Sequence, residues 1–218
     1  MVSLGREDVR SGPRVPQWYG GHSVLVTGAT SFLGMTIVEK LLRSCPDIGT
    51  IYMLARPKRG LDPQERLEDY VSNVLFSKVR GERPDYARHM SVIAGDVSSP
   101  DFRLSEHDMA AMRHEVSVVF HCAANVRFDD SLHHGVITNV VGTNRLLQLA
   151  DLLPNLQVFL YISTSFCHSD HQAAFHTRLL GNLPNTYAFT KNLTEKLVAT
   201  YRDRLPIVIA RPSIGEWE

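Results

Sequence analysis

Short apolar runs rich in β-branched residues alternate along this chain with longer segments in which apolar residues recur at helical spacing. Continuous apolar runs are typical of parallel strands buried on both faces, and parallel neighbours are usually joined by a crossover helix. The alternation therefore predicts an α/β fold with a doubly wound parallel sheet. The expected strands are Ser23 to Thr27, Thr50 to Ala55, Ser91 to Gly95, Ser117 to His121, Val158 to Ser163, and Ile207 to Ala210.

The segments between these runs carry signals for the beginnings of helices. Asp62 precedes Pro63, and Glu65 completes a capping box, so a helix is expected to begin there. The other expected helices span Phe32 to Arg43, begin near Ser105 and Asp108, and span Leu132 to Leu153 and Asn185 to Arg204. In such a sheet the ligand lies beyond the carboxyl ends of the strands, where the strand order reverses.

Composition excludes several classes of function. The 218 residues include 23 lysines and arginines and 23 aspartates and glutamates, so the net charge is 0 and no basic surplus favours a nucleic-acid partner. The longest apolar runs, Val116 to Ala124 and Val158 to Ile162, are shorter than the roughly 20 residues that span a bilayer. We expect residues 1–15 to be a flexible lead-in and residues 16–218 to be one cytoplasmic domain with reduced cysteines.

A glycine-rich turn follows the first expected strand. The sequence Thr27-Gly28-Ala29-Thr30-Ser31-Phe32-Leu33-Gly34 runs directly into a helix. Gly28 permits a tight turn, Gly34 lets the helix pack closely on the strand, and the free amides of the helix N-terminus bind a pyrophosphate. We therefore expect a Rossmann-type NAD(P)-binding fold; a glycine turn without a ligand is the alternative. The residues expected at the dinucleotide are Thr27, Gly28, Thr30, Ser31, Phe32, Leu33 and Gly34.

Ser31 occupies the position at which this motif usually has a glycine that allows the closest approach of the diphosphate. We expect its side chain to crowd the diphosphate, so that Ser31→Gly strengthens cofactor binding. The alternative is that the hydroxyl donates a hydrogen bond to a phosphate.

The residues after the second and third expected strands indicate which dinucleotide binds. An acid closing the second strand would accept hydrogen bonds from a ribose 2′-hydroxyl, whereas this chain has Arg56, followed by Lys58 and Arg59. These cations favour NADPH, and a solvated basic loop is the alternative. Asp96, followed by Val97, is placed to accept from the adenine amino group, with a turn aspartate as the alternative.

Tyr187 and Lys191 are four residues apart at the start of the last expected helix, so their side chains share a face. A phenol has a pKa near 10, and proton exchange near neutrality requires a shift of roughly three units, or about 4 kcal/mol. An ammonium at ~4 Å supplies about that much at an effective dielectric constant near 20. Ser163-Thr164-Ser165 places a hydroxyl at the same edge of the sheet. The combination predicts a tyrosine proton donor activated by a lysine.

From about Pro16 to Ile214 the chain resembles the extended short-chain dehydrogenase/reductases, and among them the fatty acyl-CoA reductase (male-sterility) family. The resemblance rests on motifs that occur in the family's order. Besides the motifs above they include His121-Cys122-Ala123-Ala124-Asn125-Val126-Arg127-Phe128-Asp129, Asn139-Val140-Val141-Gly142-Thr143, Pro184-Asn185-Thr186-Tyr187 and Arg211-Pro212-Ser213-Ile214.

The resemblance implies NADPH-dependent reduction of a long-chain acyl-CoA to a primary fatty alcohol by two successive hydride transfers. Tyr187 would protonate the carbonyl oxygen, and Thr164 would polarise the carbonyl. Lys191 would lower the pKa of the tyrosine and hold the nicotinamide ribose, and Asn139 would position the lysine through a water. The remaining implied cofactor contacts are Ala123 and Ala124 in the groove and Pro212 and Ser213 beside the nicotinamide.

Members of this family continue into a substrate-binding half and a C-terminal domain that commonly carries a membrane anchor, and both are expected to be missing here. The resemblance therefore suggests peroxisomal or endoplasmic-reticulum membrane association for full-length proteins. The segment from Phe166 to Leu183 is also shorter than in the family. Two alternatives are a truncated, non-catalytic NADP-binding protein and another thioester or aldehyde reductase of the superfamily.

Two other chemistries are disfavoured for the same region. Acylation of Cys122 or Cys167 is disfavoured because Cys122 lies in an expected buried run, where cysteine is usually an inert apolar residue. His168, His171 and His176 lie near Cys167 without a second paired cluster, so they are expected to be loop histidines and no metal is expected.

Overall fold

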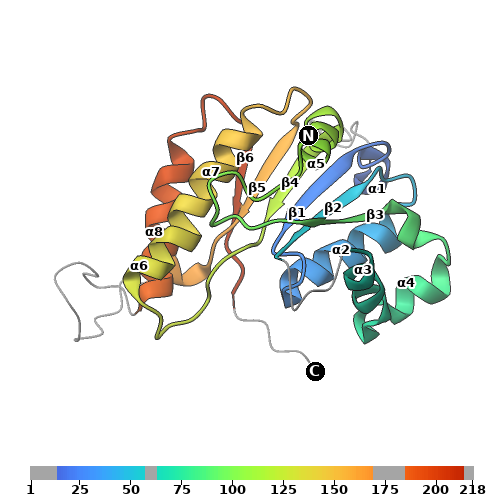
Figure 1. Ribbon diagram of the computed structural model, residues 1–218, viewed down its shortest axis with the longest axis horizontal. Helices are drawn as coiled ribbons and strands as arrows, with labels where there is room; N and C mark the ends of the chain where they lie inside the picture. Colours follow the sequence, from blue (N-terminus) through green and yellow to red (C-terminus); the bar gives the residue numbers. More distant parts are fainter. Residues whose placement is uncertain (1–13, 57–62, 169–184, 214–218) are drawn as a thin grey trace, which may run out of the picture.

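The computed structural model describes residues 14–56, 63–168 and 185–213. Within them, six parallel strands form one sheet in the order β3-β2-β1-β4-β5-β6 (Figure 1). The strands are β1 (Ser23–Thr27), β2 (Ile51–Ala55), β3 (Met90–Ala94), β4 (Val116–His121), β5 (Val158–Ile162) and β6 (Ile207–Ala210). The predicted doubly wound parallel sheet is confirmed, and each predicted strand boundary lies within one residue of the observed boundary.

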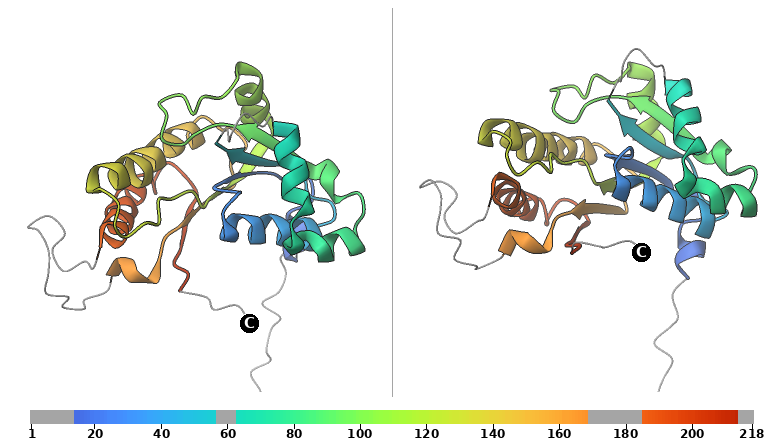
Figure 2. Two further views of the ribbon diagram at one scale, coloured as in Figure 1. Left: turned by 60° about the horizontal axis from the view of Figure 1, so that its bottom comes forward. Right: turned by 90° about the horizontal axis from the view of Figure 1, so that it is seen from below.

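Helices cover both faces of the sheet. The α-helices are α1 (Val15–Trp18), α2 (Phe32–Ser44), α3 (Pro63–Ser72), α4 (Ser77–Glu82), α5 (Glu106–Glu115), α6 (Leu132–Gly135), α7 (Gly142–Ala150) and α8 (Thr186–Ala199). Shorter turns are η1 (Val74–Phe76), η2 (Tyr86–His89), η3 (Val136–Val141) and η4 (Ser165–His168). Helices α2 and α4 pack together on one face, and α7 and α8 lie side by side on the other (Figures 1 and 2). Among the described segments, no helix has the length and apolar character needed to cross a membrane.

Alternate residues of each central strand point into two different apolar cores. In β1, Val24 and Val26 lie in the core beneath α2, together with Val38 and Leu42. Leu25 lies in the opposite core, beneath α7 and α8. Burial of both faces explains why the strands are continuous apolar runs rather than alternating patterns.

The helix predicted from Leu132 to Leu153 is interrupted in the structure. Between α6 and α7 the turn η3 is π-helical. There the Asn139 carbonyl accepts hydrogen bonds from the Thr143 hydroxyl (2.6 Å) and from the Thr194 hydroxyl of α8 (3.2 Å). Side chains thus occupy a backbone acceptor that a regular helix would use, and such turns are frequent at functional sites.

The starts of α5 and α8 agree with the predictions, whereas the end of α8 does not. Ser105 caps α5, since its hydroxyl accepts from the Asp108 amide (3.0 Å), as predicted. The last predicted helix begins after Asn185 as expected but ends earlier, at Ala199, where the chain turns toward β6. The predicted capping residue Asp62 and most of the predicted lead-in lie outside the described residues.

The strand order reverses at β1, which has β2 on one side and β4 on the other. Pairing of β1 with β4 continues one residue past the end of β4, because the Cys122 amide donates to the Thr27 carbonyl (3.2 Å). Ligands of doubly wound sheets bind outside the carboxyl ends of the strands at such a point. The candidate site is therefore built from the segments that follow β1, β4 and β5.

Candidate active site

The turn after β1 is shaped by two glycines. Gly28 has a positive φ of 67°, and a Cβ there would lie 2.6 Å from the backbone nitrogen of Ala123. A Cβ on Gly34 would lie 2.3 Å from the carbonyl oxygen of Gly28. Both positions therefore require glycine, one for the turn and one for close packing of α2 on it, as the sequence predicts. This turn leaves the N-terminus of α2 accessible, and a helix N-terminus can bind a phosphate group.

Ser31 is the N-cap of α2 and has an extended backbone, with φ at −81°. Its hydroxyl accepts from the Gly34 amide (3.2 Å) and donates to the Gly28 carbonyl (2.7 Å). The backbone at this position does not need the freedom of glycine, and the hydroxyl already has two partners within the turn. Thr30, Ser31 and Phe32 are exposed, whereas Leu33 is half-buried.

Two buried side chains form hydrogen bonds with this turn. Neither was identified from the sequence. The Tyr70 hydroxyl of α3 donates to the Ala29 carbonyl (2.6 Å). His121, at the end of β4, is bonded through Nδ1 to the Thr27 hydroxyl (2.6 Å), which also accepts from the Ala123 amide (3.3 Å). Burial lowers the pKa of His121 to about 3, so this imidazole is neutral.

The residues predicted to select the cofactor follow β2 and β3. Arg56 is exposed directly after β2, whereas Lys58 and Arg59 lie outside the described residues. Asp96 is half-buried, and its Oδ1 accepts from the amide (2.8 Å) and hydroxyl (2.7 Å) of Ser98, so it forms a turn of its own. Its neighbour Val97 is buried. Contacts of Arg56 and Asp96 with a cofactor remain predictions.

Helix α8 presents Tyr187 and Lys191 on one face, as predicted from their spacing. The helix begins where Asn185 accepts from the Ala188 amide (2.9 Å). The Thr164 side chain, which follows β5, adjoins Tyr187 and lowers the pKa of the phenol, but burial raises it by more. The structure thus brings the predicted Thr164 and Tyr187 together, with the pKa of the tyrosine above its ordinary value.

Lys191 is buried, with 2% of its surface exposed. Its Nζ donates to the Ile162 carbonyl (2.6 Å) and lies 4.7 Å from the centre of the Tyr161 ring and 5.9 Å from that of Tyr187. Loss of hydration lowers the pKa of Lys191 to about 8. In this arrangement Lys191 does not lower the pKa of Tyr187, and that role remains a prediction for the site with cofactor bound.

Asn139, in the π-helical turn, connects the segment after β4 to α8. Its Oδ1 accepts from the Asn125 amide (2.7 Å), and its Nδ2 donates to the Asn125 carbonyl (3.0 Å) and to the Thr190 hydroxyl (2.9 Å). Thr190 adjoins Lys191 in sequence, so Asn139 supports α8 one residue away from the lysine. The predicted link from Asn139 to Lys191 through a water is not tested by these contacts.

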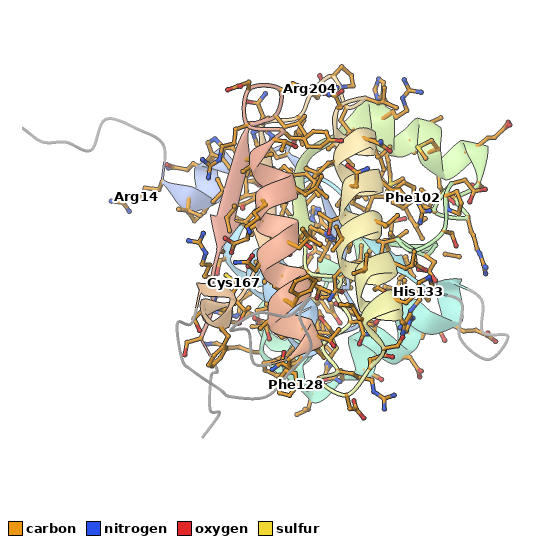
Figure 3. The ribbon with its side chains drawn as sticks, turned by 90° about the vertical axis from the view of Figure 1, so that its left-hand side faces the viewer. Arg14, Phe102, Phe128, His133, Cys167 and Arg204 are labelled. Carbon is orange, nitrogen blue, oxygen red and sulfur yellow. The ribbon has the colours of Figure 1, made fainter. Side chains whose placement is uncertain are left out.

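The remaining predicted residues lie around the same edge of the sheet. Ala123 and Ala124 follow β4 and are half-buried, and the exposed Phe128 ring of the same segment lies 6.0 Å from the Tyr187 ring. Figure 3 shows Phe128 and Arg204 at opposite ends of α8, so the tyrosine end of this helix is the one beside that segment. Pro212 and Ser213 follow β6 and are exposed, and the Pro212 carbonyl accepts from the Ser165 amide (3.1 Å).

A third residue of the α8 face, Glu195, was not predicted, although its spacing of four from Lys191 is visible in the sequence. Glu195 is buried, and both of its oxygens accept from Arg211, which follows β6 (2.8 and 2.6 Å). The Cys167 thiol donates to the same carboxylate (3.1 Å). The face of α8 that carries Tyr187 and Lys191 therefore ends in a buried ion pair.

Neither cysteine of this region is activated as a nucleophile. Burial raises the pKa of Cys122 to about 12 and also raises that of Cys167, so neither thiol is an activated nucleophile. In the part of the chain that the structure describes, no group of three or more His, Cys, Asp or Glu side chains is arranged to hold a metal ion. His171, His176 and the side chain of His168 lie outside the described residues.

Comparison with solved structures supports this assignment of the fold. The chain is 28% identical to the terminal R domain from the myxalamid PKS-NRPS biosynthetic pathway, with a TM-score of 0.71 over 89% of this chain and 49% of that one. The reductase (R) domain of a nonribosomal peptide synthetase from Mycobacterium tuberculosis is 27% identical, with a TM-score of 0.66 over 88% and 48%. The UDP-glucuronic acid 4-epimerase from Bacillus cereus, solved in complex with NAD, has the same fold at 22% identity and a TM-score of 0.59, over 88% and 56%.

Comparison with curated sequences identifies the family. The chain is 36% identical over 228 residues to fatty acyl-CoA reductase 1 of Homo sapiens and to fatty acyl-CoA reductase 2 of Bos taurus. The match covers 92% of this chain but 44% of each relative, so the chain spans less than half the length of these curated relatives. A family model described as male sterility protein matches residues 26–215. Because that match covers most of the chain, the protein belongs to the male sterility protein family, whose fold here is a nicotinamide dinucleotide-binding domain of the reductase type.

Proposed function

We propose that this chain is the NADPH-binding and catalytic domain of an alcohol-forming fatty acyl-CoA reductase, within residues 16–218. The observation that carries the proposal is that Thr164 and Tyr187 lie together beside the buried Lys191, at the edge of the sheet where the glycine turn also lies. A dinucleotide fits this edge, because Gly28 permits the tight turn and Gly34 permits the close packing of α2 that bring the helix N-terminus to the end of β1.

When bound, NADPH would supply the hydride for each of two successive reductions. Thr164 and Tyr187 donate hydrogen bonds to the carbonyl oxygen, and the negative charge that develops there is neutralised by a proton from the Tyr187 phenol. The first reduction expels the CoA thiol and leaves an aldehyde, and the second yields the primary alcohol. Two molecules of NADPH are therefore consumed for each alcohol formed.

Lys191 would hold the nicotinamide ribose and counter the effect of burial on Tyr187. Burial raises the pKa of the phenol, which disfavours its ionised form. A lysine ammonium at ~4 Å would offset about 4 kcal/mol of that cost at an effective dielectric constant near 20. The lysine is buried on the same helical face as Tyr187, with its Nζ 5.9 Å from the ring centre.

The choice of cofactor is tested by titration of the 218-residue chain with NADPH and NADH, followed by fluorescence. Arg56, exposed after β2, would pair with the 2′-phosphate, so NADPH should bind more tightly. Arg56→Asp should narrow or invert the difference, whereas Arg113→Asp, an exposed change on α5, should leave it unaltered. Equal affinities of the unaltered chain for the two cofactors would contradict the proposal.

The chemistry is tested with palmitoyl-CoA and product analysis. The 218-residue chain should bind NADPH, and its match covers less than half of each curated relative. Joined to the second half of a curated relative, it should form the alcohol. Tyr187→Phe should then lower kcat about 10²- to 10⁴-fold with NADPH affinity retained. Tyr201→Phe, which removes a hydroxyl bonded to Asn144 (3.0 Å), is the matched control, and undiminished alcohol formation by Tyr187→Phe would refute the mechanism.

A second candidate is a reductase of another acyl thioester or aldehyde. The likeness to the reductase domain of a nonribosomal peptide synthetase from Mycobacterium tuberculosis, at a TM-score of 0.66, favours it, because that reductase belongs to a different kind of enzyme. The same assay distinguishes the candidates when aldehydes and other acyl thioesters replace palmitoyl-CoA. NADPH binding without turnover of any of them would instead support a non-catalytic NADP-binding protein.

A further inference from the structure

The buried carboxylate of Glu195 needs an explanation that the proposed chemistry does not supply. Glu195 is 6% exposed and lies on α8, one turn beyond Lys191 on the face that carries Tyr187. Burying a carboxylate is expensive unless charged and hydrogen-bonding partners compensate for the lost hydration. Burial of the Glu195 carboxylate therefore depends on its charged and hydrogen-bonding partners.

The partners of Glu195 come from two other segments of the candidate site. Arg211 Nε donates to Oε1 (2.8 Å) and Nη2 donates to Oε2 (2.6 Å), which is a bidentate pair. The Cys167 thiol of η4 donates to Oε1 (3.1 Å). A bidentate arginine–carboxylate pair fixes relative orientation as well as distance, so three segments are held in one geometry.

Each of the two partner segments carries a residue of the proposed active site. Cys167 lies three residues after Thr164, and its amide donates to the Thr164 carbonyl (3.4 Å). A second contact between α8 and η4 is the hydrogen bond from Asn192 Nδ2 to the Cys167 carbonyl (2.8 Å). Arg211 directly precedes Pro212, whose carbonyl accepts from the Ser165 amide (3.1 Å). Glu195 thus joins the helix of Tyr187 and Lys191 to the turn of Thr164 and to the segment after β6.

We infer that Glu195, acting through Arg211 and Cys167, is a positioning residue that sets α8 at the distance from η4 at which Tyr187 and Thr164 reach the same carbonyl oxygen. Glu195 itself contacts neither substrate nor cofactor in this scheme. The inference rests on the proposed function, and it adds a residue on which the catalytic geometry depends.

A second ion pair in the molecule provides a matched control. Glu39 on α2 is 7% exposed and accepts from Arg43 Nε (2.7 Å), in a pair confined to one helix. Glu39→Gln therefore removes a buried, arginine-bonded carboxylate without loosening α8 from η4. Comparing it with Glu195→Gln separates the positioning role from the general cost of breaking a buried pair.

The first experiment needs no turnover and uses the 218-residue chain. Tyrosine labelled isotopically at Cζ is observed by NMR near neutral pH, and the Tyr187 resonance is assigned by its absence in Tyr187→Phe. Glu195→Gln and Arg211→Lys should each shift that resonance, because the contact between Tyr187 and Thr164 changes, whereas Glu39→Gln should not. An unshifted Tyr187 resonance in a folded Glu195→Gln protein would overturn the inference. Arg211→Lys serves the same purpose if Glu195→Gln does not fold.

The second experiment measures the alcohol-forming enzyme that contains this chain. Glu195→Gln should lower kcat about tenfold to a hundredfold, with KM for NADPH unchanged, since misplacement of about 1 Å has effects of that size. Arg211→Lys, which keeps the charge but loses the bidentate geometry, should lie between wild type and Glu195→Gln. Undiminished kcat in Glu195→Gln would overturn the inference. Absence of alcohol from the wild-type enzyme would instead overturn the proposed function, and the NMR experiment would then decide the inference alone.

Discussion

The two ends of the candidate site achieve their shapes in opposite ways. At the turn after β1 the geometry depends on the absence of side chains, since any Cβ on Gly28 or Gly34 would collide with backbone atoms. At α8 it depends on buried polar side chains, with Lys191 and Glu195 both bonded to groups beyond their own helix. The first kind of site is specified by local backbone geometry and the second by contacts between distant segments.

His121 connects these two ends. Its Nε2 is bonded to the Thr143 hydroxyl (2.8 Å), and that hydroxyl donates its proton to the Asn139 carbonyl (2.6 Å). Thr143 must therefore accept from Nε2–H, which leaves Nδ1 to accept from the Thr27 hydroxyl (2.6 Å). The chain of hydrogen bonds runs from the glycine turn to the π-helical turn beside α8, and it requires a neutral imidazole.

The largest effect is expected when a methyl group is added at the glycine turn. Gly34→Ala places Cβ 2.3 Å from the Gly28 carbonyl oxygen and 2.8 Å from Ala29 Cα, so the backbone must move. We expect a loss of roughly 3 kcal/mol of unfolding free energy or more, together with loss of NADPH binding. Urea unfolding and fluorescence titration measure the two effects.

The matched control is Gly81→Ala in α4, where a Cβ meets no atom within 4 Å. In a helix this change is neutral or stabilises by up to about 1 kcal/mol. If Gly34→Ala behaved like Gly81→Ala in both measurements, the glycine turn would not be specified by the space available to its backbone.

These differences explain what could be predicted from the sequence. The glycine turn was predictable because Gly28 and Gly34 constrain their own neighbours, and the spacing of Tyr187 and Lys191 predicted a shared face for the same reason. The pairing of Glu195 with Arg211 was not, because it depends on where β6 lies relative to α8. The π-helical turn at Asn139 likewise depends on a hydroxyl supplied by another helix.

The link through His121 predicts a particular sensitivity to acid. Its pKa is about 3 in the folded protein and near 6.5 in an unfolded chain, so below pH 6.5 the unfolded state binds a proton that the folded state does not. Stability should therefore fall as pH falls, by about 1.4 kcal/mol for each pH unit between 6.5 and 3. His121→Gln should remove this part of the pH dependence.

Urea unfolding at several pH values below neutrality measures the effect as a difference in slope between the two proteins. Carboxylates contribute equally to both and cancel in that difference. His133→Gln, a change at an exposed histidine of α6 (Figure 3), should keep the wild-type slope. Equal slopes for wild type and His121→Gln would show that the imidazole is not held neutral by burial.

At the α8 end, burial of Lys191 predicts a gain of stability in alkali. The pKa of Lys191 is about 8 in the folded protein against an ordinary value of 10.5, so between these values the unfolded state holds the extra proton. The free energy of unfolding should rise with pH across that range, by on the order of 3 kcal/mol in total. Below pH 8 Lys191 should contribute nothing to the pH dependence of that free energy. Lys191→Met should lack this rise, whereas Lys196→Met, on the exposed side of α8, should keep it. A rise of the same size in Lys191→Met would mean that the ammonium is hydrated rather than buried.

The smallest effect is expected at Ser31, whose side chain forms a hydrogen bond within the glycine turn and also adds a Cβ there. Its hydroxyl caps α2 through the Gly34 amide (3.2 Å), and its Cβ stands where the dinucleotide motif usually has none. Ser31→Ala should cost about 1 kcal/mol of stability, because it removes the cap and keeps the Cβ, whereas Ser31→Gly should cost only a few tenths. If the Cβ crowds the diphosphate, Ser31→Gly should bind NADPH more tightly by about 1 kcal/mol, or roughly fivefold, and Ser31→Ala should not. Fluorescence titration of both variants separates the two effects, and weaker binding by both would show instead that the hydroxyl is a ligand of the phosphate.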